Sequence, residues 1–367
     1  MENLMPLNKR KEFNLFDAAL ASLLFIIFNY IFSITYTITY YAMGEPTWVT
    51  YIGQFLVEAV FALVSVVIAK ARKVELFEAS GVKKRVSGRL VWFCFLVAVV
   101  AIYLFSHITS VFLDFLSLCG YKSEAQAIIV DSIWKFLLFS VILCVVPAFA
   151  EEFLFRGTIL SGLKKTGKWT ALIVSSLIFS FMHGTPDQTV HQFIIGLLVG
   201  YLFLKTGNLW ISVIVHFFNN FITIVQSFIV TLIYGTEGVA EEVVESGINP
   251  WLGLAIDLLV AVIFAYVGYL CFRYLKTKII EENERVNGKI EEPANVTISV
   301  DGKEQDVTLE VDGVPVQENA ETNVEAVETL KKVKEPVSVG TIILFALAGV
   351  WLLYDWMSVL LSGFGLF

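Results

Sequence analysis

The chain has 367 residues, of which 57% are hydrophobic and only 16% charged, and its mean hydropathy is +0.74. This composition excludes an ordinary water-soluble globular domain. The formal net charge is -8, and residues 276–336 alone hold 8 Lys and Arg against 15 Asp and Glu. The rest of the chain is therefore nearly neutral, and no basic surface of the kind that binds nucleic acid is indicated.

Apolar stretches of the roughly 20 residues needed to cross a bilayer recur along the whole chain. In chain order, we expect spanning helices at 16–41, 48–69, 90–113, 133–163, 169–184, 190–204, 208–234, 251–275 and 337–361. The predicted fold class is therefore all-α: a polytopic integral membrane protein with about eight to nine transmembrane helices that enclose an intramembrane polar site.

The distribution of basic side chains predicts the orientation, because short loops rich in Lys and Arg stay in the cytoplasm. Basic clusters occur at residues 9–11, 70–89, 164–168, 205 and 273–278. With nine spans, all of them lie on one side of the membrane, and the acidic loops lie on the other. We therefore expect a cytoplasmic amino terminus and a carboxyl terminus outside.

Three regions follow from this pattern. Residues 1–275 form the predicted transmembrane helical domain, residues 276–336 an acidic cytoplasmic loop, and residues 337–367 a C-terminal transmembrane helix. Within the loop, Asn295–Val300 and Val307–Val311 alternate apolar and polar residues beside Asp-Gly turns. This pattern is typical of a β-hairpin, although an unstructured tether is the alternative, and the role of the loop is not indicated.

Ionisable side chains inside spanning helices are costly, by about 2.5–3.5 kcal/mol for a central charge, so each one is a functional candidate. Glu152 and Arg156 are four positions apart and share a helix face, where they can pair. Glu151 is rotated by about 100° from Glu152 and lacks that partner. His216 and Asn220 are also four positions apart, which places an imidazole and an amide on the same side of their helix.

These polar groups also lie at comparable depths. At about 1.5 Å per residue, Glu151, His183 and Asn220 lie roughly 18–21 Å from the predicted cytoplasmic ends of their helices, and His216 about 12 Å. Amide hydrolysis needs a base for water, donors for the oxyanion and a proton for the leaving amine, and these side chains can supply all three. Asn219 is adjacent to Asn220 and would take its place in the site if the helix were rotated about its axis. Glu58 is also mid-span, and its role stays open.

Three motifs occur in order along the chain: Glu151-Glu152-Phe-Leu-Phe-Arg156 (EExxxR), Phe179-Ser-Phe-Met-His183 (FxxxH) and His216-Phe-Phe-Asn-Asn220 (HxxxN). They resemble the motifs of the CAAX protease and bacteriocin-processing (CPBP or Abi) family of intramembrane proteases. The resemblance covers roughly residues 133–230. It implies a protease core of this extent in a prokaryotic cell membrane, about eight helices in all, and cleavage of a membrane-tethered or prenylated peptide or protein.

The resemblance also implies roles for the motif residues. By motif position, Glu151 would activate a water molecule, His183 would position that water, and His216 with Asn220 would form the oxyanion site. Glu152 and Arg156 would support them as an ion pair, and Phe179 is the first residue of the second motif. In this interpretation, the enzyme is a glutamate endopeptidase without a cofactor.

Two alternatives stay open. A zinc protease would hold its metal with His183, His216 and Glu151 and leave a fourth position for water, although no HExxH motif is present. A non-enzymatic scaffold, transporter or bacteriocin-immunity protein would use the same cluster to bind a partner or relay protons. Neither clear inverted repeats nor broken helices favour a transporter. The substrate, a requirement for prenylation and the oligomeric state are not indicated.

Overall fold

The computed structural model describes residues 12–44, 47–123, 128–238, 249–288, 295–300, 303–308 and 337–366. Within these ranges, eight helices are long and apolar enough to cross a membrane. This confirms the predicted all-α polytopic membrane fold. The single-element spans are α1 (Leu15–Ala42), α2 (Thr47–Arg72), α10 (Pro186–Thr206), α11 (Leu209–Gly238), α12 (Pro250–Asn287) and α14 (Val339–Gly363).

The two remaining spans are composite. Residues Gly88–Leu118 comprise α4 (Gly88–Val100), the π-helical segment η1 (Ala101–Phe105) and α5 (Ser106–Leu118). Residues Ile133–Thr166 comprise the following elements: α6 (Ile133–Phe139), η2 (Ser140–Val145), α7 (Val146–Glu152), η3 (Phe153–Leu160), α8 (Ser161–Leu163) and η4 (Lys164–Thr166). Of these, η2 and η3 are π-helical and η4 is a 3₁₀ turn.

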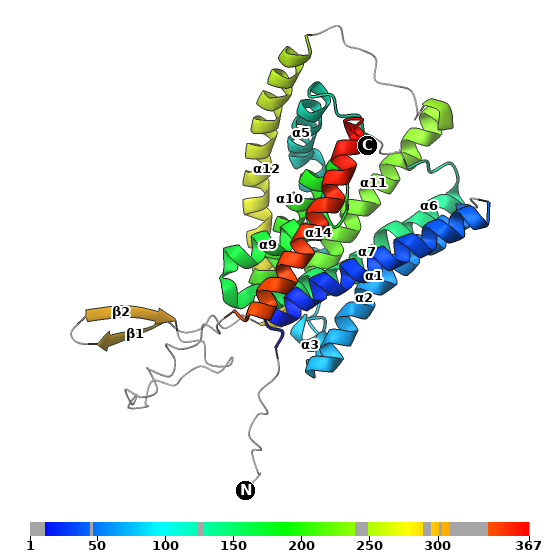
Figure 1. The fold of residues 1–367 in the computed structure, drawn as a ribbon. Coiled ribbons are helices and arrows are strands. Elements are labelled where there is room, and N and C mark those ends of the chain that lie inside the picture. The colour runs from blue at the N-terminus through cyan, green and yellow to red at the C-terminus, as the bar shows by residue number, and fades with distance from the viewer. Residues whose placement is uncertain are drawn as a thin grey trace.

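The helices pack as a bundle around α7, α10 and α11 (Figure 1). Helix α1 contacts α2 and α14 on one side, and α12 contacts α4 and α5 on the other. The beginning of α1 and the end of α14 lie at opposite ends of the bundle (Figure 1). The side of the membrane that each terminus faces stays a prediction.

The expected span at 169–184 differs from the prediction. The helix there, α9 (Lys168–Phe181), has only 14 residues, about 21 Å at 1.5 Å per residue, which is shorter than the roughly 30 Å hydrocarbon core. Gly184 adopts a left-handed conformation, with φ of +67°, and Pro186 opens α10. The chain therefore turns back early, and His183 lies in this turn, two residues beyond the end of α9.

The cytoplasmic ends predicted from charge meet in one polar contact region. Nζ of Lys84 donates to the carbonyl of Thr206 at 2.7 Å, and Nδ2 of Asn208 donates to Oδ1 of Asn283 at 2.9 Å. A Cβ on Gly81 would lie 1.8 Å from the carbonyl oxygen of Gly207, so only glycine allows this close approach. The segment after α2, the α10–α11 turn and the end of α12 are thereby fixed to one another.

Beyond α12, strands β1 (Asn295–Val300) and β2 (Lys303–Thr308) pair antiparallel, with Asn295 opposite Thr308 and Val300 opposite Lys303. The first strand coincides with the predicted one. The second begins earlier than the predicted Val307–Val311 segment, because strand pairing continues up to the Asp301-Gly302 dipeptide. The second Asp-Gly pair, at 312–313, lies outside the described residues.

Candidate active site

Glu152 is the fixed centre of the polar cluster. Its side chain is fully buried, and its Oε1 accepts hydrogen bonds from Nη1 of Arg156 at 2.6 Å and Nδ1 of His216 at 2.9 Å. The predicted Glu152–Arg156 ion pair is therefore present. The Arg156 guanidinium also lies 4.4 Å from the centroid of the Phe179 ring. These contacts hold the His216 ring in one orientation, as buried carboxylates orient imidazoles in many catalytic sites.

The carboxyl of Glu151, the neighbouring residue, makes no comparable hydrogen bonds to Arg156 or His216. Its side chain is 5% exposed, and among the described residues its Oε2 has no hydrogen-bond partner. The Nε2 of His216 lies 3.9 Å from this oxygen. Because Nδ1 of His216 donates to Glu152, Nε2 carries the lone pair of the neutral ring. The separation is too long for a direct hydrogen bond and suits a bridging water.

His183 is held by the first residue of its own motif. Its Nδ1 lies 2.9 Å from the carbonyl oxygen of Phe179, and because a carbonyl only accepts, Nδ1 is the donor. The Phe179 ring contacts His183 and His216 edge to face, with centroid distances of 5.1 and 5.9 Å. Phe179 thus separates and orients the two imidazoles, and His183 keeps Nε2 as an acceptor in its neutral form.

Asn220 bonds the fourth span one turn before a proline. In an α-helix the carbonyl of Leu143 would accept from the backbone N–H of residue 147, and Pro147 has none. Nδ2 of Asn220 donates to this carbonyl instead, at 3.0 Å. Glu151 and Glu152 therefore follow a distorted stretch of helix, with π-helical segments at Ser140–Val145 and Phe153–Leu160 on either side. Such segments occur frequently at functional sites.

Two further polar residues join the site through Asn220, and the motifs did not indicate them. Nδ2 of Asn219 donates to Oδ1 of Asn220 at 3.2 Å. The Oδ1 of Asn219 in turn lies 3.1 Å from Nε2 of His191, which is on α10. Asn219 and Asn220 are therefore hydrogen-bonded to each other, and which of the two amides serves the site stays a prediction. The contact with His191 depends on the packing of α10 against α11, which the sequence pattern does not give.

Glu58 is the other residue whose position the sequence left open. It lies on α2, which packs against α7, and its side chain is 2% exposed. Nε2 of Gln54 donates to its Oε1 at 3.1 Å, while among the described residues its Oε2 has no hydrogen-bond partner. Its carboxyl is close enough to Glu151 for the two to interact electrostatically. The depth of Glu58, about 21 Å from Arg72 at the helix end, is the sequence signal that could have placed it in this layer.

The same geometry bears on the zinc alternative. Throughout the described part of the chain, no three His, Cys, Asp or Glu side chains are arranged to hold one metal ion. Glu151, His183 and His216 thus do not form a ready ligand set of the kind that catalytic zinc requires. The residues present do not fit a zinc site, and metal dependence is a question for experiment.

Comparisons with known proteins agree with the three motifs. Residues 133–222 match a family model described as Rce1-like, type II CAAX prenyl endopeptidase Rce1-like. This segment contains all three motifs, so the resemblance to the CAAX protease and bacteriocin-processing family is confirmed over these residues.

One relative shows how far the similarity extends. A Bacillus subtilis (strain 168) protein named "Putative membrane peptidase YdiL" is 28% identical over 109 residues, which are 29% of this chain. The match spans 45% of that relative, less than half of its length. No solved structure matches the chain.

Proposed function

We propose that the protein is an intramembrane endopeptidase in which Glu151 activates water to hydrolyse a peptide bond of a membrane-tethered or prenylated peptide or protein. One observation carries this proposal. The Glu151 carboxyl is buried, its Oε2 has no hydrogen-bond partner among the described residues, and it faces an imidazole nitrogen at 3.9 Å. The family match over residues 133–222 supports peptide hydrolysis as the reaction class.

In the proposed reaction, a water molecule binds between Oε2 of Glu151 and Nε2 of His216. Glu151 takes one proton from this water as its oxygen forms a bond to the substrate carbonyl carbon. Both hydrogens of this water are then directed at Glu151 and His216, and His183 is proposed to help position the water without accepting a hydrogen bond from it. The C–N bond then breaks, and Glu151 returns its proton to the leaving amine. No cofactor is required for any of these steps.

The oxyanion of the tetrahedral intermediate needs donors directed at it. Nδ2 of Asn220 has two hydrogens, of which one is used by the carbonyl of Leu143. The second is the proposed oxyanion donor. In its neutral form His216 has only a lone pair at Nε2, so it donates to the oxyanion only as the imidazolium that Glu152 would stabilise.

The location of the site limits the substrate class. The spans that carry Glu151 and His216 are apolar, and water reaches them only through the protein. A substrate tethered to the membrane is therefore the proposed class, with prenylated carboxyl-terminal peptides as the first set to test. We propose a multi-pass location in a prokaryotic cell membrane with the amino terminus in the cytoplasm, because the basic loops lie on that side.

A cleavage assay tests this function. The purified protein in liposomes is incubated with a library of membrane-tethered and prenylated peptides, with and without a metal chelator, and products are read by mass spectrometry. Cleavage that the chelator leaves unchanged is the expected result. Cleavage lost with the chelator and restored by zinc would support the metalloprotease. Absence of cleavage across the library would contradict the enzyme and favour a scaffold, transporter or immunity role.

A further inference from the structure

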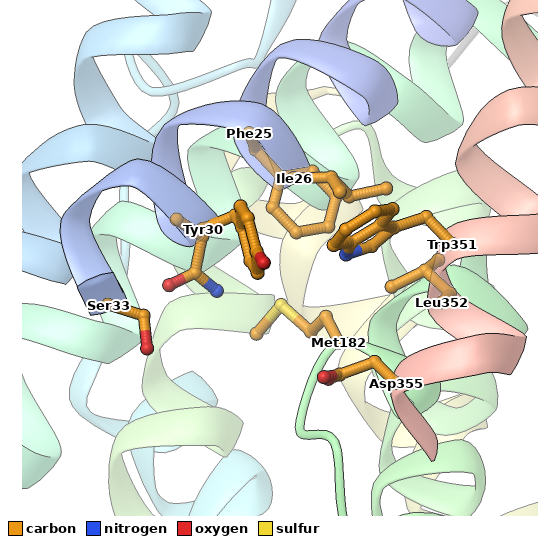
Figure 2. A pocket seen from close by; sticks show the side chains of 9 residues that line it. Phe25, Ile26, Tyr30, Ser33, Met182, Trp351, Leu352 and Asp355 are labelled. Carbon is orange, nitrogen blue, oxygen red and sulfur yellow. The ribbon is translucent and has the colours of Figure 1, made fainter. Parts of the chain in front are cut away.

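A cavity of about 120 Å³ lies between α1 and α14, beside the end of α9. Tyr30 and Ser33 on α1 face Trp351 and Asp355 on α14 across this space, and Met182 lies between them (Figure 2). A cavity of this size has room for several water molecules or for the end of an alkyl chain with a polar head. Helix α14 lies outside the segment that matches the family.

The cavity has a lining that is partly polar and partly apolar, and it is open on one side, where Tyr30, Ser33 and Asp355 are exposed. At 1.5 Å per residue, Asp355 is about 24 Å from the first residue of α14, and Asn29 is about 21 Å from the first residue of α1. Within the described part of the chain, the structure gives no hydrogen bond or ion pair to the Asp355 carboxyl or to the Asn29 side chain. Carboxyls at such depths normally face a polar cavity and have a partner there.

This cavity adjoins the candidate active site. Met182, which lines it, is the residue before His183. A Cβ on Gly184 would lie 3.0 Å from Oδ2 of Asp355, so this carboxyl rests against the turn that carries His183. On the other side, the Phe25 ring lines the cavity and contacts Phe155, at a centroid distance of 5.8 Å.

From Phe155, aromatic contacts lead directly to the site. The Phe155 ring contacts Phe179 at 5.1 Å, and Phe179 separates His183 from His216. A group bound in the cavity is therefore separated from the imidazoles by three rings on one side, Phe25, Phe155 and Phe179, and by one residue of the chain, Met182, on the other. The cavity is placed to hold the part of a substrate that flanks the bond to be cleaved.

The lining selects a ligand of one chemical class. A carboxyl without an internal partner attracts a cation, and the Tyr30 and Trp351 rings, in edge-to-face contact at 4.8 Å, offer aromatic surface that favours cations. The apolar side chains of Ile26 and Leu352 accommodate methylene groups. Among the groups of a peptide, an ammonium on an alkyl stem combines these two requirements.

On the basis of the proposed function, we propose that this cavity is a substrate subsite in which Asp355 binds an alkylammonium group. Two sources share this chemistry: a Lys side chain near the cleaved bond, and the α-amino group that cleavage liberates. Both would lie on the same side of the site as His183. Specificity would then reside in helices α1 and α14, which the family match does not include.

Binding is measured in a Glu151→Gln background, so that the peptides stay intact. The probes are fluorescent membrane-tethered peptides with one Lys, the same peptides with norleucine, and product-like peptides with a free or acetylated amino terminus. We expect the Lys peptide or the free-amine peptide to bind about tenfold more tightly than its neutral counterpart. A preference for Lys over norleucine identifies a Lys side chain as the source of the ammonium, and a preference for the free over the acetylated amino terminus identifies the α-amino group.

Asp355→Asn should abolish that preference, and Asp355→Glu should retain it. Asp257→Asn, which removes another acid from a spanning helix, should leave it unchanged. Equal binding of charged and neutral peptides by the parent, or a preference that persists in Asp355→Asn, would overturn the subsite. The proposed function is tested independently of the subsite, by cleavage. It is contradicted if the protein that retains Glu151 cleaves none of the peptides that bind.

Discussion

His216 donates a hydrogen bond to Glu152 through the same carboxylate oxygen that binds Arg156. The second glutamate of the EExxxR motif is therefore engaged in orienting an imidazole, and the proposed function assigns the activation of water to the first glutamate, Glu151. This division follows from helix geometry, because Arg156 lies one turn beyond Glu152 and not beyond Glu151.

Variants of the Glu152–Arg156 pair are expected to show that its effect on the stability of the fold can be distinguished from its effect on cleavage. Arg156→Leu alone leaves a buried unpaired carboxylate and should destabilise the fold by about 3–5 kcal/mol. Glu152→Met combined with Arg156→Leu should restore much of the melting temperature in detergent, since neither charge is then buried alone. Cleavage by the double variant should stay about 10–100-fold below wild type, because His216 has lost its orienting partner. Full activity in the stable double variant would show that this orientation is not needed.

The bond between Asn220 and the Leu143 carbonyl gives a second prediction. Asn220→Leu removes the only side-chain donor recorded for this carbonyl within the described residues and should cost about 1–3 kcal/mol. Pro147→Ala restores a backbone N–H, so the double variant should regain melting temperature without regaining cleavage. If Pro147→Ala gives no recovery, the proline does not explain why Asn220 donates to this carbonyl.

Glu58→Gln tests whether the second buried carboxyl takes part in the reaction. Glutamine keeps the size of the side chain, so the protein should insert and melt as wild type does. We expect kcat/KM to fall about tenfold, because the Glu58 carboxyl interacts electrostatically with Glu151, so its loss changes the surroundings of the proposed base. Gln54→Leu, which removes the partner of Glu58 without altering a charge, is the matched control and should have a smaller effect. An unchanged kcat/KM in Glu58→Gln would assign this residue to packing.

The acidic loop should be dispensable for the chemistry, provided that the end of α12 is kept. Asn287 bonds the backbone of Arg85 at 2.7 and 3.0 Å, so a deletion should begin after Gly288. Replacing residues 295–308 by a flexible linker should leave the cleavage of short peptides within about twofold of wild type. By contrast, Asn283→Ala, which removes a buried acceptor of Asn208, should destabilise the fold by about 1–3 kcal/mol. Loss of cleavage in a well-folded loop variant would connect the loop to the reaction.

The sequence predicted the features that depend on position along a helix. The spans agree with the structure within a few residues at most helix ends, because apolar length is the direct requirement of the bilayer. The pairing of Glu152 with Arg156 followed from their spacing alone. The depths of Glu151 and His216 indicated one layer, and the structure brings these two residues to 3.9 Å.

The remaining features depend on which helix faces lie against each other, and spacing does not determine this. Glu58 had no motif, and its approach to Glu151 follows from the packing of α2 on α7. Asn220 was expected to form the oxyanion site with His216, and its additional bond to the Leu143 carbonyl joins two helices whose contact the spacing does not give. The early end of α9 was missed because most of its residues, and those that follow it, are apolar, so hydropathy alone does not reveal that the helix is too short to span.

The most direct test of the account is single-turnover cleavage of one identified peptide by Glu151→Gln beside wild type. Glu281→Gln, a change to an exposed acid at the end of α12, is the control. We predict a fall in rate of at least about 100-fold in Glu151→Gln, with unchanged insertion and melting temperature, and no change in the control. A rate within threefold of wild type in well-folded Glu151→Gln would contradict the assignment of Glu151 as the base that activates water.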